Sequence, residues 1–288
     1  MIRKVIGAIL ALSITFLAIL AIWAFSPPSV PHYDISSEPD AIARGEYLVS
    51  AGGCVSCHEG SDGGLSGGLA IESPFGTFYA SNITPDPSTG IGDWSGQDLV
   101  RAIKHGRSPD GSFYYPAFPY RAYAGISDDE ALDIAAWLMA QEPVSNQPPE
   151  HELPAWVMRW QMAGWNLLAD WNTPELPEYA DPIIARGAHL SRNLGHCGEC
   201  HTPRNALGIS DMGREFAGGE MSDGHVEAID ADALANWSEE DLALFLFIGL
   251  KPDGEYVGGK MEPVIEHNTG RLTDEDRQAM AAFFKRGL

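Results

Sequence analysis

The most constraining feature of the chain is a five-residue pattern, Cys-x-x-Cys-His, that occurs twice in its 288 residues. The first copy runs from Cys54 to His58 and the second from Cys197 to His201, so equivalent residues lie 143 positions apart. Three further matches share this offset: Trp94-Ser95 with Trp237-Ser238, Gly106 with Gly249, and Pro109-Asp110-Gly111 with Pro252-Asp253-Gly254. Chance agreement at so many positions is improbable, so the chain is predicted to contain two equivalent units.

Both units carry the same signals for the starts of helices. The first helix is predicted to begin near Pro39-Asp40 in one unit, and at Asp181-Pro182 in the other, with Asp as N-cap and Pro at the first helical position. The later helices begin at Ser/Thr-x-x-Asp/Glu sequences: Ser95 to Asp98, Ser127 to Glu130, Ser238 to Asp241, and Thr273 to Asp276. Because strand patterns are scarce and the loops are rich in Gly and Pro, the predicted fold class is mostly α.

The two Cys-x-x-Cys-His motifs are typical of covalent haem attachment. Two thiols add to the vinyl groups of the macrocycle, and the adjacent His is placed beneath the iron as its proximal ligand. One pair alone would also suit a redox dithiol, and two pairs would suit a four-Cys zinc site. Because a His follows each pair and each pair occurs in an equivalent unit, we predict two covalently bound haem c groups. Their residues are Cys54, Cys57, His58, Cys197, Cys200 and His201, with iron bound by His58 and His201.

The sixth iron ligand is predicted for one unit only. Met261 lies in a loop before the last helix of the second unit and is the expected thioether ligand, with Met212 and Met221 as rivals nearer the motif. The offset of 143 places Phe118 at the equivalent position of the first unit, and phenylalanine cannot bind iron. The first haem is therefore five-coordinate, or takes its ligand from elsewhere; the candidates are His105, Met139, Met158 and Met162.

The N-terminus is predicted to be a membrane anchor. Arg3 and Lys4 precede an unbroken apolar run from Val5 to Phe25, which is long enough to span a bilayer as a helix. Ala24-Phe25-Ser26 resembles a signal-peptide cleavage site, but Pro27 follows it and should hinder cleavage. Since basic residues stay in the cytoplasm, we expect a single-pass protein of the inner (cytoplasmic) membrane with its haem domains in the periplasm.

The charge of the chain restricts its partners. Forty acidic residues against 18 basic ones give a formal net charge of -22. Nucleic acid is an unexpected partner for such a chain, because phosphate contacts require clustered Lys and Arg. An acidic surface favours positively charged partners, such as a basic redox protein, although it also serves solubility.

Several short segments outside these motifs are characteristic of one family. They are Arg44-Gly45-Glu46-Tyr47-Leu48, Pro74-Phe75-Gly76-Thr77, Ser81-Asn82-Ile83-Thr84-Pro85-Asp86 and Tyr115-Pro116-Ala117. Together with Cys54–His58, they make the chain after Asp40 resemble the cytochrome c subunits of membrane-bound alcohol and gluconate dehydrogenases. The resemblance implies electron transfer from a periplasmic dehydrogenase toward quinone or a terminal oxidase. The family usually carries three haems and often has Met where this chain has Phe118.

The predicted organisation is two tandem cytochrome c-type domains after an N-terminal transmembrane helix. The expected segments are an anchor at 1–26, a tether at 27–40, a first domain at 41–142, a linker at 143–180 and a second domain at 181–288. The linker is rich in Pro and Trp, and the spacing from Trp156 to Leu168 favours an aromatic helix. We expect it to pack between the domains or to form a docking surface for a partner subunit.

Two functional hypotheses follow from these patterns. The first is a non-catalytic electron-transfer subunit, since no substrate pocket with an acid–base pair is indicated and the cofactor carries the chemistry. The alternative is a dihaem oxidoreductase, a peroxidase or an enzyme that oxidises sulfur compounds. In that case the first haem, lacking a Met at position 118, would be an open catalytic site.

Overall fold

The computed structural model of the chain describes residues 6, 15, 22, 25–61, 63–221 and 224–288. The predicted anchor, Val5–Phe25 with Arg3 and Lys4 before it, lies almost entirely outside these residues. Within the described part of the chain, no helix combines the length and the apolar character needed to cross a membrane.

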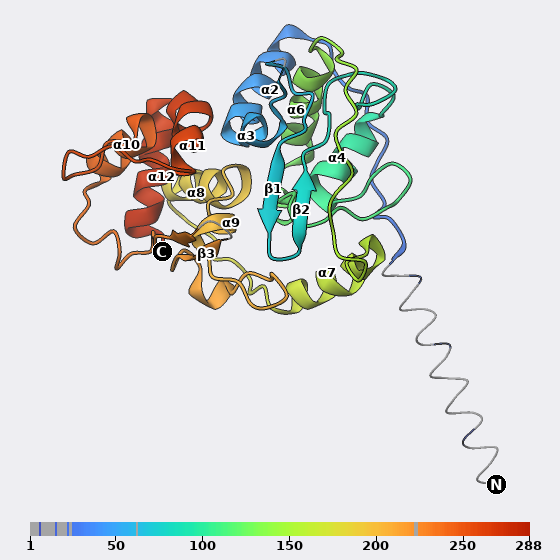
Figure 1. Cartoon of the computed structure of the whole chain (residues 1–288). Coiled ribbons are helices and arrows are strands. Elements are labelled where there is room, and N and C mark those ends of the chain that lie inside the picture. The colour runs from blue at the N-terminus through green and yellow to red at the C-terminus, as the bar shows by residue number, and fades with distance from the viewer. Residues whose placement is uncertain (1–5, 7–14, 16–21, 23–24, 62, 222–223) are drawn as a thin grey trace.

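The first unit is a bundle of helices with one small hairpin (Figure 1). Its antiparallel strands pair Ala70 with Tyr79 and Ser73 with Gly76. The elements in chain order are α2 (Pro39–Ala51), α3 (Cys54–His58), β1 (Ala70–Ser73), β2 (Gly76–Tyr79), α4 (Gly96–His105), α5 (Tyr120–Tyr123) and α6 (Asp128–Met139).

The second unit repeats this order of elements and lies beside the first (Figure 1). Its elements are α8 (Pro182–Ala188), the π-helical η2 (His189–Leu194), α9 (Gly198–His201), η3 (Met212–Arg214), β3 (Gly219–Met221), β4 (Gly224–Val226), α10 (Glu239–Ile248), α11 (Met261–His267), η4 (Thr269–Arg271) and α12 (Asp274–Arg286). Strands β3 and β4 form a second antiparallel pair.

The predicted helix starts are confirmed. Ser95, Ser127 and Ser238 are N-caps whose hydroxyls accept from the backbone N–H three residues on, and each forms a full capping box. Thr273 and Asp181 also cap their helices through side-chain oxygens. The second unit has three more residues between Met261 and Leu272 than the first has between Phe118 and Ile126. The longer α11 and the 3-10 turn η4 contain them, and they account for the change of offset.

A glycine permits the main helix crossing in each unit. A Cβ atom at Gly45 of α2 would lie 1.9 Å from the backbone oxygen of Asp133 in α6. At Gly187 of α8 it would lie 1.9 Å from the backbone oxygen of Ala279 in α12. The first and last helices of each unit therefore cross at equivalent glycines, and their backbones are equally close in both units.

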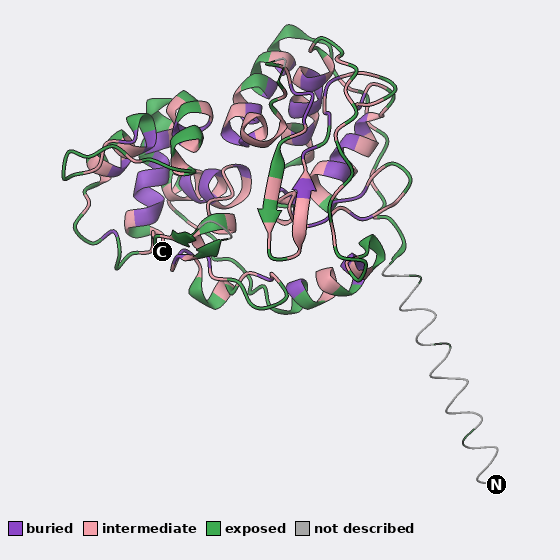
Figure 2. Cartoon of the chain, in the orientation of Figure 1, coloured by how far each residue is buried: buried purple, intermediate pink, exposed green. Residues whose placement is uncertain are grey.

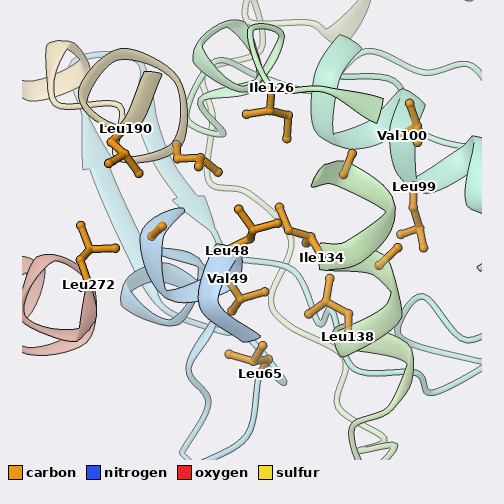
Figure 3. Close-up of a cluster of buried hydrophobic side chains, with 14 of the residues drawn as sticks. Leu48, Val49, Leu65, Leu99, Val100, Ile126, Ile134, Leu138, Leu190 and Leu272 are labelled. Carbon is orange, nitrogen blue, oxygen red and sulfur yellow. The ribbon is translucent and has the colours of Figure 1, made fainter. Parts of the chain in front are cut away.

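The two units share one apolar core. Leu48, Val49 and Ile134 of the first unit belong to the same buried cluster as Leu190 and Leu272 of the second (Figure 3). Burial continues along the helices that face the junction, whereas the outer loops are exposed (Figure 2). The units are therefore packed against each other directly, beyond their covalent link.

The linker helix begins later than predicted. Helix α7 spans Met162–Trp171, after a short 3-10 turn at Arg159–Gln161, and does not begin at Trp156. Met158 has extended backbone angles (φ -127°, ψ 142°), which ends any helical pattern before it. The expected packing role is confirmed for Trp165, whose Nε1 donates to the carbonyl of Leu207 in the second unit at 2.8 Å.

Candidate haem sites

The residues of each motif lie on a single short helical turn. In α3, Cys54, Cys57 and His58 stand at positions i, i+3 and i+4, a spacing that places them on one face. The second motif has the same spacing, with Cys197 preceding α9. The residue before each motif has a left-handed backbone: Gly53 has φ 66° and His196 has φ 40°.

The two histidines are held in the same way by backbone carbonyls. His58 Nδ1 donates to the oxygen of Ser81 at 2.7 Å, and His201 Nδ1 donates to the oxygen of Glu227 at 2.7 Å. With the proton fixed on Nδ1, Nε2 keeps the lone pair that a metal requires. Burial lowers the pKa of both imidazoles, which favours this neutral form.

The cysteines fit a covalently held haem. All four are free thiols. Burial raises the pKa of Cys54 and of Cys197 to about 12, so both are protonated at neutral pH. Among the described residues, no group of three or more His, Cys, Asp or Glu side chains is arranged to hold a metal ion. Paired thiols beside a histidine with an available Nε2 match the donor set that haem c needs.

Met261 and Phe118 occupy equivalent places in the two units. Turns at Pro116-Ala117 and Gly259-Lys260 precede them, in agreement with the offset of 143. Met261 is half-buried at the first position of α11. The ring of Phe118 packs on Tyr114 and Tyr123, with centroids 6.0 Å and 5.5 Å away. The assignment of Met261 to the iron stays a prediction, and the rival Met221 is 37% exposed.

The other candidates for the first iron have varied surroundings. Met158 Sδ accepts a hydrogen bond from Trp160 Nε1 at 3.1 Å. Met162 is buried in a cluster with Phe78, Phe113 and Tyr115, and Met139 packs against the shared core. His105 is exposed at the end of α4.

Two equivalent polar pairs tie the units together. The hydroxyl of Tyr47 in α2 donates to Asp276 Oδ2 in α12 at 2.5 Å. His189 Nε2 lies 2.8 Å from Glu130 Oε1, which pairs η2 of the second unit with α6, the last helix of the first unit. Tyr47 and His189 occupy equivalent positions in the two units, as do Glu130 and Asp276. The same contact is therefore made twice, once in each direction, as expected for an approximate twofold relationship.

Comparison with known proteins identifies the family. A cytochrome c family model matches residues 42–142. A dihaem cytochrome c-type protein of Cereibacter sphaeroides is 40% identical over 267 residues, which cover 88% of this chain and 90% of the relative. The chain belongs to the cytochrome c family. This cytochrome therefore binds haem c and transfers electrons, and its mostly helical fold is the one predicted.

Other relatives of this cytochrome are named as subunits of dehydrogenases. The gluconate 2-dehydrogenase cytochrome c subunit of Pantoea cypripedii is 38% identical, and the alignment covers 85% of this chain and 59% of the relative. The alcohol dehydrogenase (quinone) cytochrome c subunit of Gluconobacter oxydans is 36% identical, with 85% and 54% covered. The chain thus spans little more than half of these longer subunits.

Several site residues of this cytochrome could not be found from the motifs. The carbonyls of Ser81 and Glu227 have no side-chain signature, and the two loops that carry them differ in length. Tyr123 and Asn268 lie against the first motif. Tyr123 donates to Gly52 O within the first unit, and Ser56 Oγ donates across the units to Asn268 Oδ1 at 3.1 Å. The left-handed backbone at His196 did have a signal in the sequence. The offset of 143 aligns His196 with Gly53, directly before the first cysteine of each motif.

Proposed function

We propose that the chain is a membrane-anchored, periplasmic dihaem cytochrome c that passes electrons from a dehydrogenase toward quinone or a terminal oxidase. The observation that carries the proposal is the equivalence of the two motif helices, each with paired thiols and a histidine fixed by a carbonyl at 2.7 Å. Two such sites support two haems per chain, in keeping with the name of the dihaem relative.

The chain's own residues would position the cofactors. Haem supplies a one-electron couple when bound. Cys54 and Cys57, and likewise Cys197 and Cys200, would hold the macrocycle covalently, and His58 and His201 would bind the iron through Nε2. Because Cys54 and Cys197 pack against the same buried cluster, the two attachment points are brought together within one protein body. This arrangement suits electron passage from one site to the other.

A dehydrogenase is the proposed electron donor. Relatives named as subunits of gluconate, alcohol and fructose dehydrogenases support this choice. The formal net charge of -22 would accelerate encounter with a basic docking surface on the donor or the acceptor, and this steering would weaken as salt rises.

The anchor proposal rests on Val5–Phe25 and on the basic residues before it. It is tested by fractionating cells that express the full chain, followed by protease treatment of spheroplasts. The haem-staining band should stay with the membranes and should be digested from outside. Release into the soluble fraction without detergent would contradict the anchor.

The haem count is tested independently of the anchor. Intact-mass measurement after acid–acetone extraction should retain the mass of two haems. A variant with Cys54→Ala and Cys57→Ala should retain one, and the matched pair Cys197→Ala and Cys200→Ala should also retain one. A wild-type mass corresponding to one haem, or to none, would overturn the dihaem proposal.

A dihaem oxidoreductase is the second candidate function, and Phe118 is the observation that favours it. An iron without a sixth protein ligand would bind carbon monoxide in the reduced state. Absorbance titration of the reduced protein with carbon monoxide distinguishes the two candidates. No spectral change supports the electron-transfer proposal, whereas stoichiometric binding to one haem would favour an open catalytic site.

A further inference from the structure

The linker helix carries an exposed apolar face. Trp160, Leu168 and Trp171 are 58%, 50% and 90% exposed, and Gly164 between them is also exposed. Trp160 lies in the 3-10 turn before α7, and the spacing of four and three residues places Gly164, Leu168 and Trp171 along one side of α7. The other side of α7 is buried through Met162, Ala163 and Ala169. We call Trp160, Gly164, Leu168 and Trp171 the tryptophan face.

The end of the predicted anchor lies beside this face. Phe25 packs edge to face on Phe113, with ring centroids 5.8 Å apart. Arg107 Nη2 donates to the carbonyl of Ser26 at 3.4 Å. Phe25 and Trp160 line the same open cavity of about 330 Å³. In Figure 1, the described chain accordingly enters the globular part next to the start of α7.

The charge around the tryptophan face differs from that of the rest of the chain. Residues 153–169 contain no Asp or Glu and a single charged residue, Arg159, in a chain with 40 acidic and 18 basic residues. The next residue, Asp170, is paired with Arg121 at 2.8 Å. Arg159 Nη1 donates to the carbonyl of Phe113 at 2.9 Å, which places this positive charge close to Phe25's packing partner. An anionic lipid surface would repel most of this acidic protein, but it would not repel this segment.

We propose that the tryptophan face rests in the headgroup region of the membrane that holds the N-terminal anchor. This inference depends on the anchoring proposed above. Trp side chains favour the membrane–water boundary because their rings are large and apolar while Nε1 can still meet water. A helix with an apolar face of Trp and Leu lies in the plane of that boundary. With the anchor ending at Phe25, the lipid surface is the nearest large apolar partner for these side chains.

The experiment uses the full chain in liposomes whose phospholipids carry a photoactivatable diazirine on one acyl chain. After illumination, peptides are mapped by mass spectrometry. We expect label on residues 1–25 and on 154–172. Helix α10 is the matched control, because Leu244 and Phe247 are 42% and 48% exposed but belong to the second unit's outer surface. It should remain unlabelled.

A pair of variants sharpens the test. Trp171→Asp should lose the label at 168–172, whereas Leu244→Asp should leave the labelling pattern unchanged. Because both side chains are exposed, the haem absorbance spectrum should match that of the wild type and serves as the folding control. Label confined to 1–25 would overturn the tryptophan face as a lipid contact and leave it to a protein partner, while the anchor would stand. Label in α10 equal to that in 154–172 would also overturn it. Absence of label throughout would reject both the anchor and this inference, and the haem count would be unaffected.

Discussion

Tyr123 of the first unit and His196 of the second meet edge to face, with ring centroids 5.5 Å apart and planes at 84°. The hydroxyl of Tyr123 donates to the carbonyl of Gly52, two residues before Cys54. His196 directly precedes Cys197. Burial raises the pKa of Tyr123 well above its ordinary value, so the hydroxyl remains a donor at physiological pH. A single aromatic contact thus joins the backbone that leads into one motif with the backbone that leads into the other.

Replacing this tyrosine should loosen the junction. Tyr123→Phe removes the hydrogen bond to Gly52 while keeping the ring on His196, and should lower the unfolding free energy by about 1 kcal/mol. Urea unfolding followed by far-ultraviolet circular dichroism would measure the change. Tyr256→Phe is the control, because Tyr256 is 67% exposed. Equal midpoints for the two variants would show that the hydrogen bond contributes nothing.

The Glu130–His189 pair should make the junction sensitive to acid. Burial acts to raise the pKa of Glu130, but hydrogen bonds from His189 and Ser127 outweigh it and bring the pKa down to about 2. A depressed carboxyl pKa stabilises the fold at pH values above the ordinary value of 4.5, and this contribution is lost as pH falls from there toward 2. Glu130→Gln should therefore flatten the decline of unfolding free energy between those pH values by about 1 kcal/mol, allowing for solvent screening.

The control for this pH dependence is Glu255→Gln, a carboxylate in an exposed loop. It should reproduce the wild-type slope in urea titrations performed across the same pH range. An unchanged slope in Glu130→Gln would mean that the pair carries no linkage to protons.

The glycines at the helix crossings should be intolerant of any side chain. Gly45→Ala would force a Cβ to within 1.9 Å of the Asp133 oxygen, and overpacking of this kind costs about 1–3 kcal/mol or more. Gly164→Ala is the matched helical control, since a Cβ there meets nothing within 4 Å. It should raise stability by about 0.5–1 kcal/mol. Thermal unfolding of the two variants should thus shift in opposite directions.

Met261 is predicted to bind the second iron. Met261→Ala should abolish the weak near-infrared sulfur-to-iron band of the oxidised protein and lower the potential of that haem, because a thioether favours the reduced state. Leu244→Ala, at a half-exposed position of α10, serves as control. Retention of the near-infrared band in Met261→Ala would refute the assignment.

Phe118→Met tests whether the distal loops are truly equivalent. The preceding turns match, and Pro116 and Pro119 restrict the backbone on both sides of position 118. A second near-infrared band should appear in this variant. If electron paramagnetic resonance of the wild type already shows a low-spin first haem, another ligand occupies that iron, and the new band should be absent.

Local signals in the sequence were sufficient for much of the fold. The caps at Ser95 and Ser238 depend on residues within one turn, so their helices could be located without tertiary information. The start of α7 could not be located in this way. The apolar spacing from Trp156 onward is typical of a helix, but the backbone of Met158 is extended. Pairings such as Tyr47 with Asp276 join residues more than 200 positions apart, and no periodicity encodes them.

The candidate sites show the same division. The motif residues follow from covalent chemistry and could be named directly. The carbonyl of Ser81 acts through the backbone, which every residue possesses, so the sequence contains no mark of it. The sixth ligand of the first iron depends on which side chain the tertiary structure brings to the distal side of the haem. The sequence shows only that Phe118 cannot bind iron.

Asn268 lies against Gly53 and accepts a hydrogen bond from Ser56, inside the first motif. It follows Ser56 by 212 positions in the chain, so it is synthesised after the whole first unit. While the ribosome is still extending the second unit, the backbone around Cys54 has no cover from this residue. Until residue 268 has been added, the first motif therefore lacks the contact with Asn268. The contact of Asn268 with Gly53 and Ser56 can form only after most of the second unit has been made, so the surroundings of the first motif are completed by the unit that is synthesised later.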